Sequence, residues 1–183
     1  GTFSSAPRSW EEGTTDVRGI PSTQTMPNVC RVFLASSLNL KAQRDQIDLY
    51  LRKQNDRLRE QGRYLEIVRC EDASLQLSSK GDQETLNDTA AACGVFLCFI
   101  SSDIGESTVA EFDSAYESFR RRGLPRIYVF KLNSDEMIAS SKRIENLSQF
   151  IGKIENLGHY IYNFNSIDVI RNRLRDELDA WFE

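Results

Sequence analysis

Short apolar runs alternate with longer stretches of helical periodicity along most of this chain. The apolar runs predict strands over residues 29–35, 64–70, 95–100, 127–130 and 160–164. The periodic stretches predict helices over 40–61, 82–93, 108–122 and 135–157, and a last helix after Ser166, which is placed to cap it. Five such repeats favour one parallel sheet with helices on both faces, because each crossover returns the chain over the sheet.

The character of each run indicates where its strand lies in the sheet. Residues 95–100 are apolar at every position, which is typical of a central parallel strand covered on both faces. Residues 64–70 include Glu66 and Arg69, whose charges favour an edge strand. We therefore expect an α/β, flavodoxin-like three-layer sandwich whose five parallel strands have the order 2-1-3-4-5.

Two of the predicted helices carry apolar stripes that we expect to face the sheet. The stripes comprise Leu40, Ile47, Leu51 and Leu58 in the first helix, and Ile170, Leu174, Leu178 and Trp181 in the last. Gly62 follows the first stripe, as a glycine commonly follows the end of a helix.

The first 28 residues differ in composition from the rest of the chain. Gly, Ser, Thr and Pro make up 15 of them, and their few apolar residues follow no period. A segment of this composition buries too little apolar surface to order itself. We therefore expect residues 1–28 to form a flexible tail or linker and residues 29–183 to form one folded domain.

Composition narrows the class of protein without indicating a function. The 183 residues carry a net charge of −4, which argues against a dedicated nucleic-acid surface. The longest apolar run covers only residues 95–100, whereas a membrane-spanning helix needs about 20 residues. No basic segment leading into an apolar run opens the chain, so we expect no secretory signal, no membrane association and a cytoplasmic location.

The cysteines are consistent with that location. Cys30, Cys70, Cys93 and Cys98 form no C-x-x-C pair, and the chain has a single histidine, His159. A zinc site would therefore need all four thiolates or unusual oxygen ligands. We expect no metal site and reduced cysteines in the core, where a free thiol behaves as a small hydrophobe.

The expected topology indicates where a ligand would bind. In doubly wound sheets, ligands bind beyond the carboxyl ends of the strands where the strand order reverses, which here lies between the first and third strands. Residues 35–37 and 101–107 leave these two strands, and both segments are small and rich in hydroxyl groups. Neither contains a glycine-rich phosphate-binding motif. The sequence therefore predicts a polar ligand site without such a phosphate loop.

Glu111 is the acidic residue that stands out near this site. The helix after the third strand has an apolar stripe of Val109, Phe112, Tyr116 and Phe119. On a helical wheel, Glu111 flanks this stripe among small side chains. In the first turn the helix dipole would favour its ionised form, which suits stabilising a positive charge. The spacing Thr108-x-x-Glu111 by itself favours a capping box instead, in which Glu111 would bond only to backbone.

Other polar residues carry weaker signals. Glu71 and Asp72 follow the second strand at the same edge, where adjacent acids also suit a solvated loop. His159 precedes the fifth strand and so lies at the opposite edge, which favours a structural role. Ser36 and Ser37 have no nearby histidine to activate a nucleophile, which disfavours serine-hydrolase chemistry.

Several short motifs occur in a fixed order along the chain. They are RVFLASS at 31–37, Arg44-Asp45, YLEIVRCED at 64–72, Gln83 with Asn87, STVAEFDSAY at 107–116 and GHY at 158–160. Together they resemble bacterial Toll/interleukin-1 receptor (TIR)-like domains over residues 29–182. The segment around Glu111 also resembles the G-[ST]-x-x-E-x-x-x-A motif of nucleoside 2-deoxyribosyltransferases, which are distant relatives with the same sheet.

The resemblance implies a flavodoxin-like TIR fold and an enzymatic activity. In enzymatic TIR domains, a glutamate on the helix after the third strand cleaves the nicotinamide–ribose bond of NAD, and Glu111 occupies the matching position. NAD is then a substrate, and no permanently bound cofactor is implied. TIR–TIR contacts that form a homo-oligomer, in a defence or signalling system, are implied as well. The residues that we expect to contact the nucleotide are Ala35, Ser36, Ser37, Glu71, Asp72, Ser107, Thr108 and Tyr116.

Three other functions fit the same motifs. A non-catalytic signalling or assembly domain would use Glu111 only as a helix cap. Nucleoside 2-deoxyribosyl transfer would use Glu111 as a covalent nucleophile. A nucleotide sensor would bind a cyclic or ADP-ribose-type nucleotide without turning it over.

Overall fold

The computed structural model describes residues 28–69, 81–133 and 141–183, together with the first two residues. In these ranges the strands are β1 (Asn28–Ser36), β2 (Arg63–Arg69), β3 (Val95–Ile100), β4 (Arg126–Leu132) and β5 (Ile161–Phe164). The helices are α1 (Lys41–Glu60), α2 (Asp82–Ala92), α3 (Glu106–Arg122), α4 (Ser141–Asn156) and α5 (Ile167–Glu177), with short 3-10 helices η1 (Leu38–Leu40) and η3 (Leu178–Phe182). The expected tail falls almost wholly on residues 3–27, outside the described residues, and stays a prediction.

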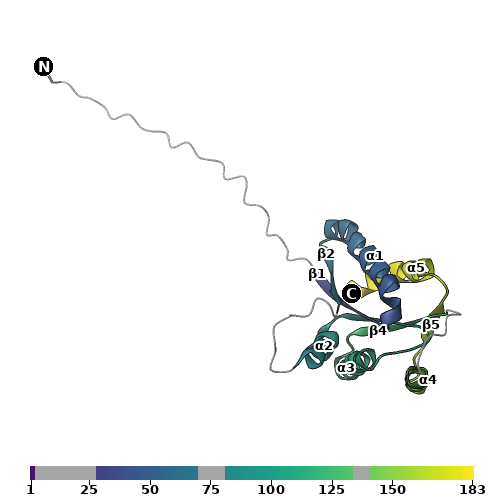
Figure 1. Ribbon diagram of the computed structural model, residues 1–183. Coiled ribbons are helices and arrows are strands. Elements are labelled where there is room, and N and C mark those ends of the chain that lie inside the picture. The colour runs from purple at the N-terminus through teal and green to yellow at the C-terminus, as the bar shows by residue number, and fades with distance from the viewer. Residues whose placement is uncertain (3–27, 70–80, 134–140) are drawn as a thin grey trace.

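The strands form one parallel sheet of order β2-β1-β3-β4-β5, which confirms the predicted topology. Every residue of β3 is buried, as its unbroken apolar run predicts, and β2 lies at an edge. Helices α1 and α5 with η3 cover one face, and α2, α3 and α4 cover the other (Figure 1). The fold is therefore an α/β, flavodoxin-like three-layer sandwich. Among the described helices, none has both the length and the apolar composition needed to cross a bilayer.

The predicted stripes of the first and last helices face the core. All eight of their residues are buried in one hydrophobic cluster with the sheet, and they are Leu40, Ile47, Leu51, Leu58, Ile170, Leu174, Leu178 and Trp181. The buried side of α1 also contains Arg44, Asp48 and Asn55, which an apolar stripe does not predict. Gly62 follows α1 with a positive φ of 68°, as expected for the residue after a helix end.

Asn55 ties α1 to the edge strand β2. Its side-chain amide donates to the Leu65 carbonyl at 2.9 Å, and its oxygen accepts from the Leu65 N–H at 2.7 Å. Because Asn55 is buried, replacing it by Ala would leave both backbone groups without these partners. We expect Asn55→Ala to lower the free energy of unfolding by about 2 kcal/mol. Urea unfolding, with the exposed neighbour Lys53→Ala as control, measures this loss, and equal midpoints for the two variants would contradict it.

The expected capping box at the start of α3 is wrong. The helix begins at Glu106, and Gly105, in extended conformation, is its N-cap residue. Thr108 is therefore inside the helix, and its hydroxyl donates to the Ser36 carbonyl of β1 at 3.3 Å. Glu111 lies in the second turn, beyond the backbone N–H groups that a capping carboxylate bonds. A cap consequently does not explain Glu111.

The buried face of α3 also differs from the predicted stripe. Of the expected stripe only Phe112 is buried, and the other three members are half-buried, namely Val109, Tyr116 and Phe119. The face instead turns toward Thr108, Glu111, Ala115 and Ser118. This rotation follows from a second contact, because α3 packs against α2 as well as the sheet and the Ser118 hydroxyl donates to the Ala91 carbonyl at 2.9 Å.

The described cysteines lie in the core, as predicted. Cys30, Cys93 and Cys98 are buried and form no disulfide with one another. Burial raises the pKa of the Cys30 and Cys93 thiols to about 11, which keeps them neutral at physiological pH. Cys70 lies outside the described residues. Within the described part of the chain, no group of His, Cys, Asp and Glu is arranged to hold a metal ion.

Candidate functional site

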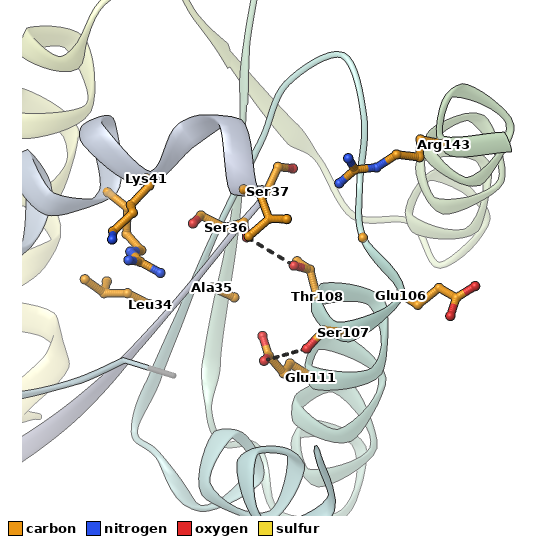
Figure 2. Close-up of a pocket in the computed structure, with 13 residues that line it drawn as sticks. Leu34, Ala35, Ser36, Ser37, Lys41, Glu106, Ser107, Thr108, Glu111 and Arg143 are labelled. Carbon is orange, nitrogen blue, oxygen red and sulfur yellow. Dashed lines mark hydrogen bonds between the residues drawn. The ribbon is translucent and has the colours of Figure 1, made fainter. Parts of the chain in front are cut away.

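A pocket lies at the carboxyl ends of β1 and β3, between α1 and α3, where the strand order reverses (Figure 2). Its volume is about 240 Å³. Ligand pockets commonly measure ~300–1,000 Å³, so the described part of this one suits a nucleoside-sized group rather than a whole dinucleotide. The lining residues are Leu34, Ala35, Ser36, Ser37, Leu38, Lys41, Arg44, Gly105, Glu106, Ser107, Thr108, Glu111 and Arg143.

Hydrogen bonds hold together the two loops that form this pocket. The buried Ser37 hydroxyl donates to the Asp103 carbonyl at 2.7 Å, and the Ser37 N–H donates to the Phe99 carbonyl at 3.0 Å. The Asn39 amide donates to the Ser101 hydroxyl at 2.7 Å. The segments that follow β1 and β3 are thus bonded to each other, which gives the pocket a fixed wall.

Glu111 projects from α3 into the pocket with a residue exposure of only 4% (Figure 2). Burial raises the pKa of its carboxyl group to about 7, because a charged carboxylate is poorly solvated there. The nearby Arg44 guanidinium acts in the opposite direction, because it favours the charged carboxylate. Burial thus outweighs the helix dipole, whose effect fades within the first turn, and Glu111 is less readily ionised than the sequence predicts.

Three positively charged side chains line the pocket. Lys41 and Arg44 reach it from α1, and Arg143 reaches it from α4. Arg44 is only 4% exposed, with its Nη2 3.5 Å from Asp45 Oδ1, and the Arg143 Nε lies 3.1 Å from an Asp103 carboxylate oxygen. Among the described lining residues, three cations face two carboxylates. This excess of positive charge suits a ligand that carries a negative group, with a second part that contacts the Glu111 carboxyl group.

Comparisons with known proteins add little to this picture. No protein-family model matches the chain, and no curated protein matches it. Among solved structures, the chain is similar to a crystal structure of the RPS4 and RRS1 TIR domain heterodimer. The TM-score is 0.46 at 12% sequence identity, and the match covers 85% of this chain and 99% of the other. A similarity this distant assigns no role to any residue of the pocket.

The pocket brings together most of the residues that the sequence singled out. Six of them line it, namely Ala35, Ser36, Ser37, Ser107, Thr108 and Glu111. Tyr116 is not among the lining residues, which corrects that expectation. Its ring packs on Phe112 at 6.1 Å and on His159 at 5.7 Å between centroids, because five residues of helix turn it to another side of α3 than Glu111. Glu71 and Asp72 lie outside the described residues.

Sequence reasoning assigned no role at this site to Arg44 or Arg143. Arg44 stands four residues after Leu40 and three before Ile47, so it occupies a core-facing position of the first helix. A charged residue within an apolar stripe is the signal that could have identified it. Arg143 gives no such signal, because it lies in the first turn of an amphipathic helix whose packing against the pocket depends on tertiary structure.

Proposed function

We propose that this chain is a TIR-like module that hydrolyses the nicotinamide–ribose bond of NAD. The observation that carries the proposal is the buried Glu111 carboxyl group, directed into a pocket at the switch point of the sheet. The ordered motifs that resemble TIR-like domains support the same assignment. The proposal includes a cytoplasmic location and activation by homo-oligomer formation, both of which rest on that resemblance and on the composition.

In the proposed reaction, the bond between ribose C1′ and the pyridinium nitrogen breaks. Its electron pair goes to the nitrogen, so nicotinamide leaves as a neutral molecule and positive charge develops on the ribose. The Glu111 carboxylate stabilises this charge in a site of low polarity, where such an interaction is strong. Water then attacks C1′ and loses a proton, which gives ADP-ribose.

The other side chains of the pocket have roles that match this substrate. Ser36 lines the same pocket as Glu111, and its hydroxyl suits the sugar hydroxyls. Lys41 and Arg44 suit the negative charge of the diphosphate, since both cations line the same cavity. The enclosed volume accommodates the nicotinamide riboside end, where the reaction takes place.

The proposal is tested by incubating the purified chain with NAD and measuring nicotinamide and ADP-ribose. The protein is assayed both dilute and concentrated with a crowding agent, because the active form is proposed to be an oligomer. Release of nicotinamide supports the proposal, and no release under either condition contradicts it. A mass increase on Glu111 after incubation with a deoxynucleoside, without NAD turnover, would instead favour nucleoside 2-deoxyribosyl transfer.

The rate of NAD cleavage is expected to rise with pH. Because the stabilising group is the ionised carboxylate and its pKa is raised to about 7, most Glu111 is neutral in mildly acidic solution. We expect kcat/KM to be about five-fold lower at pH 6 than at pH 7 and to level off above pH 8. A kcat/KM profile between pH 5 and pH 9 measures this. A rate that falls as pH rises would assign Glu111 the role of a proton donor instead.

A further inference from the structure

A chain of hydrogen-bonding side chains joins Glu111 to helix α2. The Ser107 hydroxyl oxygen lies 2.7 Å from Gln83 Oε1 and 3.4 Å from Glu111 Oε1. The Gln83 amide nitrogen in turn donates to Asn87 Oδ1 at 2.8 Å, which fixes its oxygen toward Ser107. Gln83 is exposed and does not line the pocket. A contact with ligand therefore does not explain why Gln83 takes part in these hydrogen bonds.

Ser107 has one proton to share between its two neighbours. A hydroxyl group donates one hydrogen bond and accepts others through its lone pairs. The shorter contact, to Gln83, takes this proton, because the amide oxygen can only accept. A lone pair of Ser107 is then left toward Glu111, so the 3.4 Å contact is favourable only when the carboxyl group carries the proton and donates it.

We propose that Gln83 and Ser107 form a relay that holds Glu111 as the neutral acid until a cationic ligand enters the pocket. In this relay the Glu111 carboxyl group donates to Ser107, and Ser107 donates to Gln83. Gln83 is therefore a positioning residue, which acts on Glu111 only through Ser107. The inference concerns the protonation of Glu111 in the proposed NAD-cleaving site. Only its consequence for catalysis rests on that proposed function.

The relay explains how a buried acid can serve a cationic substrate. A neutral Glu111 adds no uncompensated charge to the pocket of the free protein. A pyridinium-bearing ribose brings a positive charge beside it, which favours the carboxylate and releases the proton to solvent. A ligand of the same shape without that positive charge would not favour the carboxylate form of Glu111. The pocket would thereby favour the oxidised, positively charged nucleotide.

Other charges around Glu111 act on it in parallel with the relay. Arg44 of α1 favours the carboxylate, and the pocket is also lined by the charged side chains of Lys41, Arg143 and Glu106. The Cys98 thiol of β3 also lies near Glu111, and it is neutral because burial raises its pKa. On α2, the neighbouring acids Glu84 and Asp88 are exposed to solvent. Variants of uncharged residues therefore test the relay without altering these groups.

The test is a direct titration of Glu111 in the full 183-residue chain. With ¹³C-labelled glutamate, the carboxyl resonance of Glu111 is assigned from its loss in Glu111→Gln and followed from pH 4 to pH 9. In Gln83→Met the Ser107 proton is free to turn toward the carboxylate, so we expect the pKa of Glu111 to fall by roughly one unit. In Gln83→Glu a stronger acceptor holds that proton, so the pKa should rise.

Two further variants separate the relay from a general change in the pocket. In a Ser107→Ala background, Gln83→Met should no longer shift the titration of Glu111, because the connecting hydroxyl is absent. Gln46→Met, an exposed substitution on α1 across the sheet, should leave it unchanged. An unchanged or raised pKa in Gln83→Met, or a shift that persists without Ser107, overturns the proposal. The titration needs no turnover, so loss of the relay and absence of NAD cleavage are separate results.

Discussion

Replacing Glu111 by Gln is expected to lower the rate of nicotinamide release from NAD by about 10²–10³-fold, the usual loss when one electrostatic stabiliser of a transition state is removed. Gln has nearly the same size and can occupy the same space, but it carries no negative charge. The loss should therefore appear in kcat, where the ribose becomes positive, and only weakly in KM. Steady-state measurement of nicotinamide at saturating NAD gives both constants.

Glu106→Gln is the matched control for this experiment. Glu106 belongs to the same helix and lines the same pocket, but it is exposed and its carboxylate points away from Glu111 (Figure 2). Its replacement should change kcat less than two-fold. If Glu111→Gln releases nicotinamide as fast as the unchanged protein, the carboxylate is not the catalytic group. The group that cleaves NAD would then be another residue of the chain.

Glu111→Gln is also expected to make the protein more stable at neutral and higher pH. The pKa of the Glu111 carboxyl group is raised from 4.5 to about 7 by burial. Between these values the folded state holds a proton that the unfolded state has released, so the unchanged protein loses stability as pH rises. Each pKa unit corresponds to about 1.4 kcal/mol, and the whole shift to about 3 kcal/mol. This loss is complete once the pH exceeds the folded pKa.

The difference between the two proteins is the quantity to measure. Their free energies of unfolding in urea should be similar near pH 4, where Glu111 is neutral in both states. Near pH 8 the Gln variant should be about 3 kcal/mol more stable than the unchanged protein. Taking the difference removes the contribution of all other titrating groups. A difference that does not vary with pH would mean that Glu111 titrates normally in the folded protein.

The strands and their order could be predicted because parallel sheets impose a strong pattern. A strand covered on both faces must be apolar at every position, as 95–100 is, and an edge strand tolerates charges such as Glu66. Once the order is known, the carboxyl ends of the first and third strands meet by necessity. Residues 35–37 and the start of α3 could therefore be placed at one pocket from sequence alone.

The parts that sequence did not predict depend on contacts between distant segments. The rotation of α3 follows from its packing against α2. The periodicity of the α3 sequence alone cannot indicate this contact. The same rotation buries Glu111 and so raises the pKa of its carboxyl group, against the expectation from the helix dipole. Arg44, which belongs to a core-facing stripe, reaches the pocket only because α1 lies beside it. Local pattern indicates an element, whereas the protonation of a side chain depends on what surrounds it.

The two faces of the sheet are assembled from different parts of the chain, and this has a consequence during synthesis. The face covered by α2, α3 and α4 draws mainly on residues 86–154, whereas the α1 face also needs Leu178 and Trp181 of η3. The Asn28 amide even donates to the Phe182 carbonyl at 3.3 Å. During synthesis, the α2, α3 and α4 face can therefore pack while η3 is still inside the ribosomal tunnel. At that stage part of the apolar surface of α1 is not yet covered. That uncovered apolar surface is where a nascent-chain chaperone would bind.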